Sequence, residues 1–241
     1  MSRALVLALA APFAAAEFLL PPPADMVALN TTAGFDVLIG GETLRRSYVA
    51  LGPHFTTQVT QSYCALASAA AALNALPSVG APVDPAYAPY AYWTQDVLAA
   101  DDCVRKKAAF HSLKFGLARD ELAAALTDCV DGVSVANYAA APSWNASGDG
   151  LREILVDALR GSGRGHALAN FERAFLGEAG AGGHWSPVAA YDGAGDRALV
   201  LDVARYKYPP TWVRTADLAR AMVAPDPDGK QARGLLVLTP Q

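Results

Sequence analysis

Charged residues are scarce in this chain of 241 residues. Asp, Glu, Lys and Arg make up 17% of it, the formal net charge is −4, and the densest basic clusters are Arg45-Arg46 and Arg105-Lys106-Lys107. A protein that binds nucleic acid needs a basic patch or stripe, so the composition argues against nucleic acid as the main partner. Apolar residues make up 53% of the chain, which is typical of a folded globular protein and excludes a disordered one.

Long hydrophobic runs are also missing. A membrane-spanning helix needs about 18 or more consecutive apolar residues. Pro12, Glu17 and the triplet Pro21-Pro22-Pro23 interrupt the apolar N-terminal region before that length is reached. We therefore expect no stable membrane span.

The N-terminal segment MSRALVLALAAPFAAA nevertheless resembles a targeting sequence. It has a positive charge at Arg3, an apolar stretch over residues 4–11 and small residues at Ala14 and Ala16. This pattern is typical of a secretory signal peptide, and an apolar tail or an organelle transit sequence are the alternatives. We interpret residues 1–16 as a leader and residues 17–241 as one domain. The leader predicts the secretory pathway, a vacuole or a plastid; the location is cytoplasmic if the leader is not functional.

Cysteine is rare, with Cys64, Cys103 and Cys129 as the three positions. In an oxidising compartment three cysteines cannot all pair, so one stays free. Cys103 and Cys129 can then form a disulfide while Cys64 remains a thiol. The three are spread too widely for the short spacings of structural zinc sites, so we expect no metal site in the protein.

The middle of the chain has helical periodicity and its last third has strand patterns. Ala65 to Leu76 has apolar residues at helical spacing, with Ser62 as the expected N-cap. Further helices are expected over 94–100, 118–128 and 150–160, and a short strand-like run lies at 35–40. Strands are expected in HALANFE, HWSPVAAYD, RALVLDVAR and RGLLVLTP. Because the turn DGAGD joins the second and third of these, the sheet is expected to be antiparallel and the fold class α+β.

Cys64 lies at the start of the first of these helices. A cysteine in the first turn sits beside free N–H groups and the positive end of the helix dipole, both of which favour the nucleophilic thiolate. The alternative is a small buried core residue.

A cysteine nucleophile needs a base and a group that orients the base. His184 opens one predicted strand and Asp202 lies on the next. If the turn is symmetric about Ala194, the two side chains are diagonal neighbours on one face of the hairpin. A register slip of one residue would separate them, and His184 is then a polar residue at a strand end.

Gln58 precedes Cys64 by six residues. Its amide N–H₂ group is a candidate partner for the backbone N–H of Cys64 in stabilising a tetrahedral oxyanion. A solvated loop side chain is the alternative.

Four segments resemble the catalytic domain of the phytochelatin synthases, the glutathione γ-glutamylcysteinyltransferases. They are TQVTQSYCALAS, NAL, GHWSPVAAYD and, most specifically, LVLDVARYKYPPTWV, and the similarity runs from about residue 34 to about residue 238. The family is papain-like, so the resemblance implies a helical N-terminal lobe and a C-terminal antiparallel sheet. It also implies that residues 17–241 form a catalytic domain, in a short form without the cysteine-rich C-terminal extension.

The resemblance assigns the nucleophile to Cys64, the general base to His184, the orienting carboxylate to Asp202 and the oxyanion glutamine to Gln58. The expected reaction cleaves the Cys-Gly bond of glutathione and transfers γ-Glu-Cys to glutathione or a phytochelatin, which detoxifies heavy metals. Candidate cations for the substrate carboxylates are Arg205, Lys207, Arg173 and Arg233.

No tightly bound cofactor is expected. Heavy-metal ions such as Cd and Zn are expected to activate through glutathione thiolate complexes. A homodimer is an open alternative to a monomer. Three other functions remain open: a glutathione hydrolase that forms γ-Glu-Cys and Gly, a papain-like peptidase acting on another peptide, and a catalytically inactive thiol or metal-binding protein.

Overall fold

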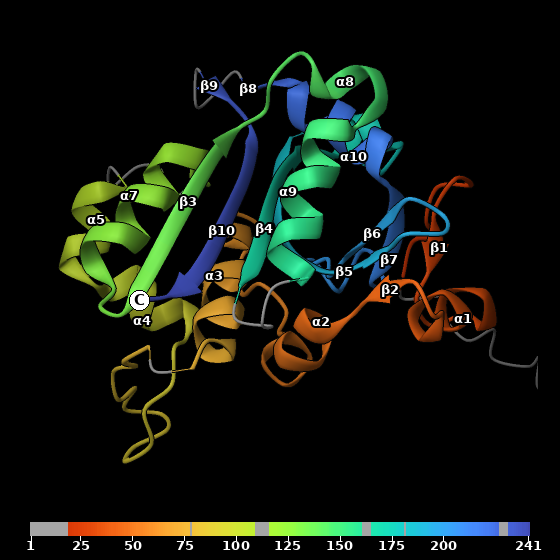
Figure 1. Ribbon diagram of the computed structural model, residues 1–241. Helices are drawn as coiled ribbons and strands as arrows, with labels where there is room; N and C mark the ends of the chain where they lie inside the picture. Colours follow the sequence, from red (N-terminus) through yellow and green to blue (C-terminus); the bar gives the residue numbers. More distant parts are fainter. Residues whose placement is uncertain (1–18, 78, 109–115, 161–164, 181, 227–230) are drawn as a thin grey trace, which may run out of the picture.

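The computed structural model describes residues 19–77, 79–108, 116–160, 165–180, 182–226 and 231–241 (Figure 1). The expected leader, residues 1–16, lies outside these ranges. No helix among the described residues is long and apolar enough to cross a membrane.

One antiparallel sheet organises the molecule. Its strands follow the order β1-β7-β6-β5-β4-β10-β3, and β2 pairs with β5. The strands are β1 (Val27–Ala28), β2 (Thr43–Leu44), β3 (Val133–Ala139), β4 (His166–Glu172), β5 (Gly183–Asp192), β6 (Arg197–Val200), β7 (Thr211–Arg214) and β10 (Gly234–Pro240). A separate two-stranded ribbon pairs β8 (Pro225–Asp226) with β9 (Gln231–Ala232). The antiparallel sheet in the last third of the chain was predicted and fits the α+β class.

The helices cover both faces of this sheet (Figure 1). They are α1 (Thr32–Ile39), α2 (Arg46–Leu51), α3 (Cys64–Ala75), α4 (Gln95–Ala100), α5 (Asp102–Lys107), α7 (Arg119–Cys129), α8 (Trp144–Ser147), α9 (Asp149–Arg160) and α10 (Thr215–Val223), with 3-10 turns η1 (Gly52–His54) and η2 (Arg173–Leu176). The predicted helices at 65–76, 94–100, 118–128 and 150–160 correspond to α3, α4, α7 and α9.

Among the described residues the core consists of two clusters, one on each face of the sheet. Along β10, Leu236 belongs to the cluster beneath α3 and α7, whereas Leu235 and Val237 belong to the cluster beneath α9 and α10. Leu168 and Ala167 on β4 divide between the clusters in the same way. Successive side chains of a strand point to opposite faces, so a strand buried on both faces has a continuous apolar sequence. This explains the run GLLVLTP.

Two local predictions were wrong. The strand expected at residues 35–40 is instead the end of helix α1 and its C-cap, Gly40. The Thr31 side chain accepts a hydrogen bond from the Gly34 N–H at 3.1 Å and caps the start of this helix. The N-cap of α3 is Tyr63 rather than Ser62, and it makes no side-chain capping bond.

Candidate active site

Cys64 is the first residue of α3, and its side chain is buried, with 5% of the residue exposed. The helix packs against β5 in the centre of the sheet. Its small residues, including Ala67 and Ala71, are almost fully buried. They allow the helix to lie close to the strand, and the sulfur therefore faces the strand that carries His184.

The β5–β6 hairpin brings His184 and Asp202 together by a route that differs from the predicted one. The turn closes with Asp192 opposite Arg197, which shifts the register by one residue from symmetry about Ala194. A β-bulge between Val188 and Ala190 then restores the predicted alignment, with Val188 opposite Val200. Strand β6 ends there, so Asp202 lies after the strand and not within it. The bulge offsets the slip that would otherwise have separated the two side chains.

His184 and Asp202 form a direct hydrogen bond. His184 Nε2 lies 2.8 Å from Asp202 Oδ1, and both side chains are about 95% buried, with 4% and 5% exposed. Asp202 Oδ1 also accepts from the Ala204 N–H at 2.8 Å. Because Asp202 occupies Nε2, the Nδ1 atom of His184 is the ring nitrogen left for Cys64, with which the imidazole makes a side-chain hydrogen bond.

The charges of this group favour an ion pair between sulfur and imidazole. Burial alone raises the pKa of the Cys64 thiol, but the hydrogen bond and charge of His184 and the backbone N–H groups of Trp185 and Ala65 lower it below its ordinary value. Burial lowers the pKa of His184, but the charge and hydrogen bond of Asp202 raise it overall. Thiolate and imidazolium therefore stabilise each other.

Asp202 carries the negative charge that holds this pair in place. Burial raises the pKa of its carboxyl, but His184 and Arg173 together hold it well below its usual range. Arg173 Nη1 lies 2.8 Å from Asp202 Oδ2, and Arg173 also pairs with the buried Glu178. The sequence did not predict this carboxylate–guanidinium chain.

Gln58 is buried beside the same group. Its backbone N–H donates to the Val203 carbonyl at 2.9 Å, which ties it to the residue that follows Asp202. Its Nε2 atom donates to the Thr60 carbonyl at 2.8 Å and to the Tyr206 hydroxyl at 3.1 Å. Both amide hydrogens are therefore engaged within the protein.

Tyr206 is the site residue that sequence reasoning missed. Burial, together with the nearby charges of Asp202 and Cys64, raises the pKa of its hydroxyl, which keeps the O–H protonated at neutral pH. The oxygen accepts from Gln58, so its own hydrogen remains free to donate. Its position four residues after Asp202, in the most specific of the family-like segments, was the available signal.

The expected substrate cations divide into two kinds. Arg173 and Arg233 are 5% and 2% exposed, and protein carboxylates neutralise them: Asp202 and Glu178 for the first, Glu172 and Asp226 for the second. This placement corrects the prediction that these two bind substrate carboxylates directly.

Arg205 and Lys207 have no carboxylate partner among the ion pairs of the described residues. The Arg205 guanidinium is exposed and lies 4.9 Å from the centre of the Phe55 ring. Lys207 is half-buried. These two remain candidates for substrate carboxylates.

Comparison with known proteins places the chain in a family. A family model described as phytochelatin synthase matches residues 18–235. The chain belongs to the phytochelatin synthase family. It is 28% identical over 225 residues to glutathione gamma-glutamylcysteinyltransferase 1 of Arabidopsis thaliana, covering 88% of this chain and 42% of that protein.

Two further relatives are also described as glutathione gamma-glutamylcysteinyltransferases. Glutathione gamma-glutamylcysteinyltransferase 1 of Lotus japonicus is 29% identical, covering 91% of this chain and 41% of the relative. The enzyme of Schizosaccharomyces pombe is 27% identical, covering 90% and 50%. The chain thus spans about half or less of the length of these relatives.

Proposed function

We propose that this protein is a papain-like acyltransferase that acts on glutathione, with residues 17–241 as its catalytic domain. The observation that carries the proposal is the Cys64–His184–Asp202 arrangement, with the cysteine at a helix N-terminus and the carboxylate on the far nitrogen of the imidazole. Nucleophile, base and orienting group in this order are what covalent acyl transfer requires.

Acylation begins with the Cys64 thiolate, which attacks the carbonyl carbon of the Cys-Gly bond of glutathione. The C–N bond breaks, and the His184 imidazolium gives its proton to the leaving amine of glycine. A γ-Glu-Cys thioester of Cys64 and a neutral His184 remain. Asp202 keeps the ring oriented, since it fixes Nε2 while Nδ1 carries the transferred proton.

Deacylation reverses the proton flow. The α-amine of a second glutathione or of a phytochelatin attacks the thioester carbonyl, and His184 accepts the proton released from that amine. The Cys64 thiolate leaves, and the product has one more γ-Glu-Cys unit. Water in place of the amine gives γ-Glu-Cys by hydrolysis. Access of amine relative to water therefore decides between transferase and hydrolase.

The oxyanion of each tetrahedral intermediate needs hydrogen-bond donors. The backbone N–H of Cys64 at the helix start and the Gln58 amide supply them, the Gln58 amide by exchanging one of its present acceptors for the oxyanion. Arg205 and Lys207 are the cations that we assign to the glutathione carboxylates. Cd and Zn enter as part of the substrate, as glutathione thiolate complexes.

Product analysis tests this function. The protein is incubated with reduced glutathione, with and without Cd or Zn, and the products are identified by mass spectrometry beside a Cys64→Ser variant. Products of the form (γ-Glu-Cys)n-Gly that depend on Cys64 support a phytochelatin synthase. Only γ-Glu-Cys and glycine would make the protein a glutathione hydrolase, and no Cys64-dependent turnover would refute both.

A further inference from the structure

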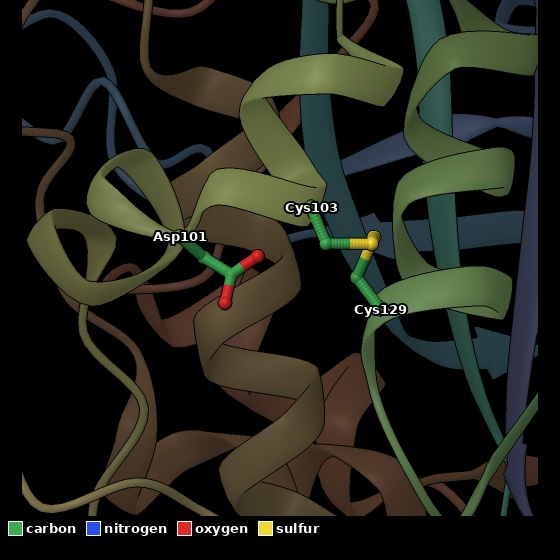
Figure 2. Close-up of side chains that lie close together, drawn as sticks. All are labelled: Asp101, Cys103 and Cys129. Atoms are coloured by element: carbon green, nitrogen blue, oxygen red, sulfur yellow. A yellow bond between two sulfur atoms is a disulfide. The ribbon is translucent and has the colours of Figure 1, made fainter.

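The structure brings three residues of metal-binding types together, Asp101 and Cys103 from one segment and Cys129 from another. A disulfide joins Cys103, in the first turn of α5, to Cys129, the last residue of α7, across a separation of 26 residues. The Asp101 carboxylate lies beside this disulfide, and the two sulfurs and a carboxylate oxygen are all within 4.8 Å of one another (Figure 2). Wide sequence spacing had argued against any such cluster.

The carboxylate is held in position by the backbone. Asp101 is the N-cap of α5, and its Oδ1 accepts a hydrogen bond from the Val104 N–H at 2.9 Å. One oxygen is thus oriented by the helix start while the other remains available as a ligand. Hydrogen bonds of this kind orient metal ligands and raise their affinity. The side chains are accessible, because Asp101 is exposed and both cysteines are half-exposed.

We propose that Cys103, Cys129 and Asp101 form a thiol-gated site for a thiophilic divalent cation, Zn²⁺ or Cd²⁺. Two thiolate sulfurs bound at about 2.3 Å to a tetrahedral zinc lie roughly 3.8 Å apart, a separation at which the sulfurs are in non-bonded contact. Reduction of the disulfide lets the two sulfurs move apart to this distance. The Cα atoms lie 5.6 Å apart, and side-chain rotation alone supplies the change. Asp101 is the third ligand, and a solvent molecule or an external thiolate takes the fourth position.

Opening the site is a two-electron reduction by a small thiol. One thiolate attacks a sulfur of the disulfide, which forms a mixed disulfide and releases the other cysteine as a thiolate. A second thiol molecule then resolves the mixed disulfide and leaves as the oxidised dimer. Two thiols are oxidised for each protein disulfide reduced. The cation next displaces the protons of the two cysteine thiols and binds between them.

The two states of the site share one structural role. Helices α5 and α7 pack against each other, and α7 lies on β3 at the edge of the sheet. The disulfide joins these helices when it is oxidised, and the metal joins them when the cysteines are reduced. This inference does not depend on the proposed acyltransfer, because its ligands lie outside the Cys64 site.

Metal binding to the whole chain tests the proposal without any activity assay. The free thiol is first removed with a Cys64→Ser background. The protein is prepared oxidised, or reduced by a phosphine that is then removed without oxygen. Zn²⁺ is titrated against a chromophoric chelator, and Cd²⁺ is followed by its thiolate charge-transfer absorption. We expect one equivalent per chain in the reduced form and none at this site in the oxidised form.

Two variants identify the ligands. Asp101→Asn preserves the helix cap and is expected to weaken metal binding at least about tenfold. Substitutions around a metal site lower metal affinity by about 10–100-fold, and this is the lower end of that range. Asp102→Asn is the matched control, because the neighbouring carboxylate is exposed and does not belong to the cluster. Equal binding by the oxidised and reduced forms, retention in Cys103→Ser/Cys129→Ser, or equal effects of the two asparagine variants would each overturn the proposed site.

Discussion

Replacing Asp202 with asparagine removes a charge from the most connected side chain of the site and leaves its shape. The carboxylate is 2.8 Å from His184 Nε2, 2.8 Å from the Ala204 N–H and 2.8 Å from Arg173 Nη1. The amide leaves Arg173 with Glu178 as its remaining partner in a buried setting. Breaking a buried ion pair by removing one partner costs about 3–5 kcal/mol, so we expect a loss of stability of that order.

The effect on catalysis has a separate cause. Without the carboxylate the pKa of His184 falls, because the charge and hydrogen bond of Asp202 raise it. The pKa of Cys64 is then expected to rise, because the hydrogen bond and charge of His184 lower it and less imidazolium is present. The imidazole also loses the acceptor that fixes its tautomer. The equivalent change in a serine protease triad lowers kcat by about 10⁴-fold, and we expect a loss on the order of 10³–10⁴ here.

Two assays separate folding from chemistry. Urea unfolding gives the stability loss, and the rate of Cys64 alkylation by iodoacetamide as a function of pH gives the thiol pKa. Asp196→Asn is the matched control, since Asp196 also pairs with an arginine, Arg152, but lies in the hairpin turn. We expect the alkylation profile to move to higher pH only in Asp202→Asn. An unchanged profile in a folded Asp202→Asn protein would refute the reasoning.

Three smaller predictions follow from other contacts. Tyr206→Phe removes the hydroxyl that accepts from Gln58, and we expect kcat to fall about tenfold or more with little change in stability, because the oxyanion donor Gln58 is then less well positioned; equal kcat would exclude a role for the hydroxyl in positioning Gln58. His166 is fully buried against Ser47, and burial lowers its pKa. As the pH falls, His166 therefore binds a proton in the unfolded chain before it does so in the folded chain. Stability is therefore expected to drop as pH falls below about 6.5, and urea unfolding should show a smaller drop in His166→Asn. Gly34→Ala would place a methyl group 2.0 Å from a backbone carbonyl oxygen, and urea unfolding should show a loss of about 1–3 kcal/mol; wild-type stability would contradict that contact.

The sequence predicted the parts of the site that depend on local pattern. Cys64 at a helix start follows from apolar spacing, and the strand that carries His184 follows from its bounding glycine and aspartate. The antiparallel hairpin follows from a short turn. The sequence also indicated the disulfide between Cys103 and Cys129 as one option, because three cysteines allow few pairings.

The remaining features depend on contacts that a pattern does not encode. The bulge in β5 corrects a register that the turn alone sets one residue away, and Pro187 just before it was the available signal in the strand sequence. Arg173 and Arg233 were expected to face substrate, but buried carboxylates neutralise both. A buried arginine and an exposed one have the same letter in a sequence, and only the fold distinguishes their partners.

The most direct test of the central claim is the intact mass of the protein shortly after mixing with glutathione. A thioester on Cys64 adds the mass of γ-Glu-Cys less water, and peptide mapping under acidic conditions locates it. Cys64→Ala is the control, because it removes the free thiol and retains the other two cysteines as the Cys103–Cys129 disulfide. The account predicts the adduct on Cys64 in the native protein and its absence in Cys64→Ala. Turnover of glutathione without that adduct would contradict covalent catalysis by Cys64. Equal turnover by the native protein and Cys64→Ala would contradict it as well.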